Sequence, residues 1–143
     1  PVDLLASAET WQQQQFEPGD LIRLVGYPHG MQFDPNPAGG YATTRLGAFA
    51  GFPLQPTPKS RMFLIDCNIF EGDSGGPIYF LGDQPAGGGP RPIFLLGLLH
   101  GQHFLNEGFR TVYQTGELRH RFGLGIVVHA AALRETLDQI AIE

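Results

Sequence analysis

Short apolar runs, each stopped by glycine or proline, are the feature that most restricts what this chain can fold into. The sequence has 20 Gly and 12 Pro in 143 residues, and both residue types interrupt regular secondary structure. Apolar residues make up 42% and charged residues only 16%, a balance that favours short strands and many turns over long amphipathic helices. The pattern therefore predicts an all-β, mainly antiparallel fold.

The individual runs predict six strands followed by one helix. We expect strands over 20–28, 41–50, 62–65, 78–81, 93–99 and 123–128. The glycine- and proline-rich stretch 84–92 predicts a hairpin with a long tip. Leu133, Leu137 and Ile140 recur at the spacing of one helix face, which predicts a terminal amphipathic helix over 130–142. No internal repeat is visible, so the order of elements favours one antiparallel barrel or sandwich.

Charge and cysteine content exclude several classes of partner and cofactor. The net charge of −5 and the pI near 5.4 argue against nucleic acid as a partner. Cys67 is the single cysteine, which excludes an intrachain disulfide and favours a buried small apolar role. No apolar run reaches the about 20 residues that cross a bilayer, so we expect no membrane span. The histidines lack the spacing of zinc ligands, and we expect neither metal nor cofactor.

Residues 72–77 read Gly-Asp-Ser-Gly-Gly-Pro, a run small enough for successive backbone N–H groups to converge on one point. The run resembles the nucleophile motif of the chymotrypsin/trypsin family at all six positions. The resemblance implies that Ser74 is the nucleophile of a serine peptidase and that the N–H groups of Gly72 and Ser74 form its oxyanion hole. It also implies a buried Asp73 that structures the loop, pairing with a freed N-terminus or with local donors. The alternative is an ordinary glycine-rich hairpin turn.

The resemblance extends over about residues 18–140. It is carried by Gly19-Asp20, Gly26-Tyr27-Pro28, Arg45-Leu46-Gly47, Phe63-Leu64-Ile65-Asp66, Gly97-Leu98-Leu99-His100-Gly101 and Gly123-Leu124-Gly125-Ile126-Val127. The layout is similar to the C-terminal barrel of disulfide-poor bacterial trypsin-like peptidases. It implies an interdomain linker over 1–17 and, over 18–143, a six-stranded barrel that includes the terminal helix 130–142. It also implies an exported protein, periplasmic or secreted.

The resemblance also indicates what this stretch lacks. The family's histidine and aspartate come from an N-terminal barrel that precedes the serine. We expect a missing N-terminal barrel as partner, a chain that is inactive by itself, and an exposed interdomain face through which it can form a homodimer. One alternative is a compact enzyme in which His29 and Asp34 complete the triad. Another is a catalytically inactive module that binds extended peptides.

The resemblance further implies a set of residues that bind a polypeptide substrate. Asn68 stands at the base of the specificity pocket, where a neutral amide favours a polar or medium-sized apolar side chain over Lys or Arg. Phe70 and Glu71 shape that pocket, or Phe70 fills the core instead. The strand His100, Gly101 and Gln102 pairs with substrate backbone. His100 lines the cleft near Ser74, or is hydrogen-bonded in the barrel wall.

Overall fold

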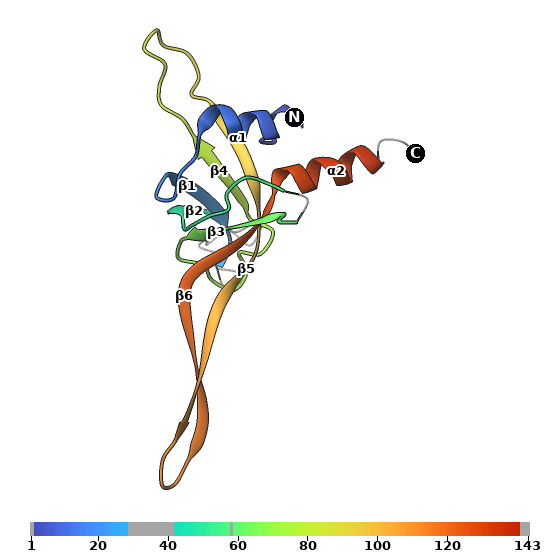
Figure 1. The fold of residues 1–143 in the computed structure, drawn as a ribbon. Coiled ribbons are helices and arrows are strands. Elements are labelled where there is room, and N and C mark those ends of the chain that lie inside the picture. The colour runs from blue at the N-terminus through green and yellow to red at the C-terminus, as the bar shows by residue number, and fades with distance from the viewer. Residues whose placement is uncertain (1, 29–41, 58, 141–143) are drawn as a thin grey trace, which may run out of the picture.

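A closed barrel of six antiparallel strands forms the body of the computed structural model, which describes residues 2–28, 42–57 and 59–140. The strands are β1 (Leu21–Gly26), β2 (Thr43–Phe49), β3 (Met62–Asp66), β4 (Pro77–Leu81), β5 (Ile93–Arg110) and β6 (Thr115–His129). Around the barrel they follow the order β1-β2-β3-β6-β5-β4 (Figure 1). The predicted all-β, mainly antiparallel barrel with a helix after its last strand is confirmed.

Alternation of side chains builds the barrel interior. In β1, Ile22 and Leu24 are fully buried, whereas Leu21 is 60% exposed. Successive side chains of a strand point to opposite faces, so one face of each strand can fill the interior. Burying one such aliphatic side chain stabilises the fold by about 1.5–3 kcal/mol. The short strands thus hold together because every strand contributes to one shared core.

Strands β5 and β6 run far beyond the barrel. They span 18 and 15 residues, and their outer halves remain paired with each other from Phe104 and Arg121 to Arg110 and Thr115. Figure 1 shows this pair as a long twisted ribbon that projects away from the other strands. The strands predicted over 93–99 and 123–128 are only its barrel-embedded portions.

The segment before β1 packs onto the barrel. It contains a 3₁₀ turn, η1 (Val2–Leu4), and the helix α1 (Ala8–Gln14), which Ser7 caps with its side chain. Trp11 of α1 is 1% exposed and contacts four rings, those of Phe16, Phe49, Phe63 and His129. These five residues are called the aromatic cluster below. The prediction of an interdomain linker over 1–17 stays a prediction, but Leu5, Ala6, Trp11 and Phe16 of this segment are buried in the core.

The last helix, α2 (Ala130–Ile140), follows β6 directly. Ala130 is buried and Leu133 packs against the core, but Leu137 and Ile140 are 46% and 67% exposed. Figure 1 shows α2 leaving the barrel, which explains why the far end of its apolar face is uncovered. Among the described residues, no helix is long and apolar enough to cross a membrane.

Candidate active site

The hexapeptide folds as a tight turn between β3 and β4. Gly72 and Gly75 have φ values of 96° and 84°, a region that side chains rarely adopt. The Gly75 N–H donates to the Leu99 carbonyl at 2.7 Å, and the Leu99 N–H donates to the Gly76 carbonyl at 2.9 Å. A Cβ on Gly76 would lie 2.4 Å from the Val25 carbonyl oxygen. The turn is therefore fixed between β1 and β5, and three of its positions require glycine.

Two amide groups of this turn are unused. The N–H groups of Asp73, Gly75 and Gly76 all donate to backbone carbonyls. Within the described part of the chain, the N–H groups of Gly72 and Ser74 donate to no protein acceptor. These are the two donors that the resemblance assigns to an oxyanion hole. Because Gly72 and Ser74 are exposed, a carbonyl oxygen from outside can approach them.

Asp73 is held inside the barrel by an arginine from β2. Its side chain is fully buried, and Arg45 is 17% exposed. Arg45 donates to both carboxylate oxygens, at 2.7 Å from Nη1 and 2.5 Å from Nη2, and the Phe70 N–H donates to Oδ2 at 2.8 Å. Gly26 makes room for the pair, since a Cβ there would lie 2.4 Å from Asp73 Oδ1. The carboxylate thus ties the loop to β2 through a bidentate ion pair. The Phe70 N–H is a local donor of the expected kind, whereas Arg45 lies 28 residues away and was not among the expected partners.

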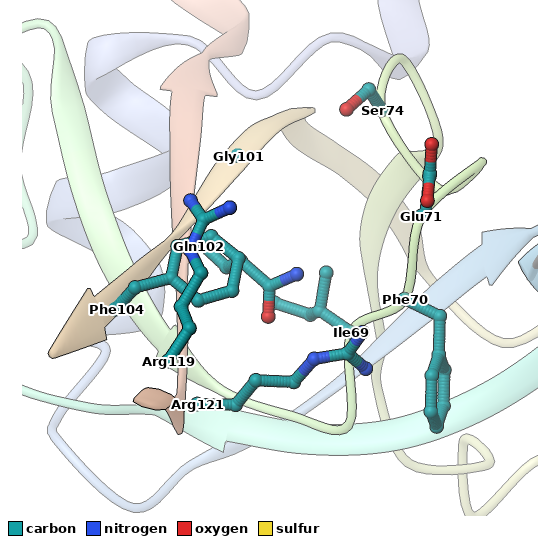
Figure 2. Close-up of a pocket in the computed structure, with 9 residues that line it drawn as sticks. All are labelled: Ile69, Phe70, Glu71, Ser74, Gly101, Gln102, Phe104, Arg119 and Arg121. Atoms are coloured by element: carbon teal, nitrogen blue, oxygen red, sulfur yellow. The ribbon is translucent and has the colours of Figure 1, made fainter. Parts of the chain in front are cut away.

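A pocket of about 490 Å³ opens beside the serine (Figure 2). Its lining consists of Ile69, Phe70, Glu71, Ser74, Gly101, Gln102, Phe104, Arg119 and Arg121. The first four come from the segment 69–74, the next three come from β5, and the two arginines come from β6. Closure of the barrel brings these three segments together. A side chain presented next to Ser74 can therefore enter a space with an apolar wall and two positive charges.

The pocket includes most but not all of the predicted substrate-binding residues. Phe70, Glu71, Gly101 and Gln102 line it, whereas His100 lines a smaller depression of about 280 Å³ that Ser74 also borders. Asn68 does not line it. This residue lines a separate depression with residues of β1 and β2, and its carbonyl accepts a hydrogen bond from Arg45 at 2.9 Å. Among the described residues, Asn68 therefore does not line the pocket beside Ser74, and its place at the base of a specificity pocket stays a prediction.

No base for Ser74 is found among the described residues. Among the described acceptors, the Ser74 hydroxyl donates only to the His100 carbonyl oxygen, at the long distance of 3.5 Å. His120 pairs with Glu107 on the projecting ribbon at 3.0 Å, and burial in the aromatic cluster lowers the pKa of His129 from 6.5 to about 4. His103 is exposed on β5. His29 and Asp34, the alternative pair, lie outside the described residues.

Sequence reasoning missed Arg119 and Arg121. Their spacing of two was the available signal, because alternate residues of a strand share one face. The sequence predicts the last strand over 123–128, so both arginines fall outside every predicted strand and their spacing could not be interpreted as a shared strand face. Only the extension of β6 to Thr115 brings both arginines to the pocket.

The chain matches no protein-family model and none of the curated proteins with which it was compared. The resemblance to trypsin-like peptidases is carried by the sequence motifs named above.

Proposed function

We propose that this chain is the nucleophile-bearing barrel of a trypsin-like serine peptidase. The single observation that carries the proposal is the turn around Ser74. It combines an exposed hydroxyl, two unused amides at Gly72 and Ser74, and an adjacent pocket. An ordinary glycine-rich hairpin turn does not require these three features, whereas acyl transfer requires all of them.

In the proposed reaction, Ser74 Oγ forms a bond to the carbonyl carbon of a peptide while the carbonyl oxygen accepts hydrogen bonds from the two unused amides. Breaking of the C–N bond releases the amine and leaves an acyl-enzyme, which water then hydrolyses. The serine proton passes to a base and from the base to the leaving amine. Removing one oxyanion donor from an enzyme of this kind costs about 3 kcal/mol of transition-state stabilisation.

The proposal requires a base from outside the described residues, because none of their histidine rings contacts the Ser74 hydroxyl. We assign this role to a histidine of an N-terminal barrel, oriented by an aspartate of the same barrel. Without them the hydroxyl is a weak nucleophile. Asp73 does not substitute for that aspartate, since both of its carboxylate oxygens are engaged by Arg45.

The lack of a base among the described residues also favours a second candidate, a non-catalytic module that binds extended peptides. In that case the peptide would lie along Gly101 and Gln102 and use the pocket. The two candidates share a binding site and differ only in whether Ser74 becomes reactive.

Covalent labelling by a fluorophosphonate separates the candidates. The reagent forms an Oγ–P bond with an activated serine and loses fluoride, so intact mass reports one adduct. The protein is tested as encoded, with any upstream residues retained. The variant Ser74→Ala and the control variant Ser60→Ala are tested beside it. Ser60 is a suitable control because its hydroxyl donates to the Met62 carbonyl and lies outside the candidate site. We expect one adduct in the parent and in Ser60→Ala, and none in Ser74→Ala.

An absence of adducts in all three proteins would overturn the peptidase proposal in favour of the binding module. The same assay on residues 1–143 alone tests the source of the base. An adduct there that Ser74→Ala lacks would mean that the base lies within these residues, and the proposed N-terminal barrel would not be needed.

A further inference from the structure

The pocket beside Ser74 is positively charged although the chain as a whole is acidic. The chain has a net charge of −5, yet the nine lining residues include two arginines and only one carboxylate, Glu71. Glu71 is exposed and forms no ion pair with a described residue. The lining therefore retains a positive excess where a substrate side chain would enter.

Both arginines keep their hydrogen-bond donors available. Within the described ranges, neither the Arg119 nor the Arg121 side chain forms a salt bridge or a hydrogen bond. Each instead lies against an aromatic ring, Arg119 at 3.5 Å from the centroid of Phe104 and Arg121 at 5.5 Å from that of Phe70. Ring contacts of this kind restrict a guanidinium without using its N–H groups. The donors are thus partly ordered before any ligand binds.

The remaining lining suits the stem and the end of a short acidic side chain. Ile69, Phe70 and Phe104 offer apolar surface to methylene groups. Gln102 Oε1 is buried and has no partner among the described residues, so its carboxamide can turn its N–H donors toward a bound oxygen. Figure 2 shows the Arg121 guanidinium reaching across the pocket toward Phe70, while the Arg119 guanidinium lies closer to Gly101. A carboxylate in this space meets donors from two directions.

We propose that this pocket binds the side chain of a glutamate or aspartate, the residue whose carbonyl Ser74 attacks. The assignment rests on the proposed function for the position of the scissile bond, but recognition of the carboxylate depends only on the pocket. Arginine is the side chain best matched to carboxylates, because its planar donors form two parallel hydrogen bonds. A lysine or arginine of the substrate is repelled, and glutamine loses the charge-assisted part of the contact.

Binding by peptides that differ in one residue tests the assignment without catalysis. Isothermal titration calorimetry of the Ser74→Ala protein is carried out with acetylated, amidated hexapeptides whose fourth residue is Glu, Gln or Lys and whose other residues are Ala and Pro. We expect the Glu peptide to bind at least about tenfold more tightly than the Gln peptide. The Lys peptide should bind more weakly than either, and the difference between Glu and Gln should shrink in high salt.

Variants of the two arginines then locate the effect. Arg119→Gln combined with Arg121→Gln should abolish the preference for Glu, whereas Arg110→Gln should retain it. Arg110 is exposed on the same ribbon but is not among the lining residues. All of these positions are exposed, and an unchanged unfolding midpoint shows that each variant folds.

The outcomes separate this inference from the peptidase proposal. A Glu preference that depends on the arginines supports the pocket assignment, even if the fluorophosphonate leaves Ser74 unlabelled. Equal binding of Glu and Gln peptides, a preference that survives the double variant, or no peptide binding at all overturns the assignment, even if Ser74 is labelled.

Discussion

The ion pair between Arg45 and Asp73 gives a prediction whose size can be worked out from the structure. Arg45→Met keeps an unbranched apolar stem but leaves the fully buried Asp73 carboxylate without its cation. Removing one partner of a buried pair costs about 3–5 kcal/mol. Because Arg45 is 17% exposed, water can partly solvate the Asp73 carboxylate once the guanidinium is removed. We therefore expect the lower end of this range of free energies. Loss of the hydrogen bond to the Asn68 carbonyl adds about 1 kcal/mol.

Urea unfolding followed by tryptophan fluorescence measures this loss, because Trp11 is the only tryptophan and is 1% exposed. With a slope of about 2 kcal/mol per molar urea, a loss of about 3–4 kcal/mol lowers the midpoint by about 1.5–2 M. The matched control is Arg61→Met. Arg61 and Glu135 form an ion pair in which both side chains are 54% exposed, and its removal should cost less than about 1 kcal/mol.

A double-variant cycle tests whether the cost arises from the pair itself. Arg45→Met combined with Asp73→Asn removes both charges, so its loss should be about 2 kcal/mol smaller than the sum of the single losses. The reasoning is refuted if Arg45→Met moves the midpoint no further than Arg61→Met does. It is also refuted if the two single losses simply add.

Two further predictions concern the barrel core. Burial lowers the pKa of His129 from 6.5 to about 4. As the pH falls through this window, the unfolded chain therefore binds a proton before the native chain does. The free energy of unfolding should then drop by at most about 3 kcal/mol between pH 6.5 and pH 4. His129→Phe should flatten this part of the stability profile measured by urea unfolding, and parallel profiles would contradict the prediction. A Cβ on Gly97 would lie 2.1 Å from the Val128 carbonyl oxygen, whereas nothing lies within 4 Å of a Cβ on Gly108. By thermal unfolding, Gly97→Ala should therefore lose about 2–3 kcal/mol and Gly108→Ala less than about 0.5 kcal/mol, and similar losses at the two positions would contradict the close approach of β6 to Gly97.

Local patterns were sufficient for the barrel strands and for the serine turn. Apolar alternation and the glycine and proline residues around it mark each barrel strand, because period and turn chemistry are encoded in neighbouring residues. The run at 72–77 predicted a tight turn for the same reason, since its glycines permit the positive φ values found at Gly72 and Gly75. The terminal helix followed from the spacing of Leu133, Leu137 and Ile140, although the barrel covers only the start of its apolar face.

Tertiary structure decided the features that depend on residues distant in sequence. Trp11 enters the core because rings from β2, β3 and the end of β6 surround it, and no local pattern indicates such a cluster. The partner of Asp73 lies 28 residues away, on a strand that only barrel closure brings to the turn. Arg119 reaches the pocket because pairing with β5 extends β6 to Thr115. Strand and turn propensities act between neighbours in sequence, whereas ion pairing, ring packing and strand register depend on closure of the whole barrel.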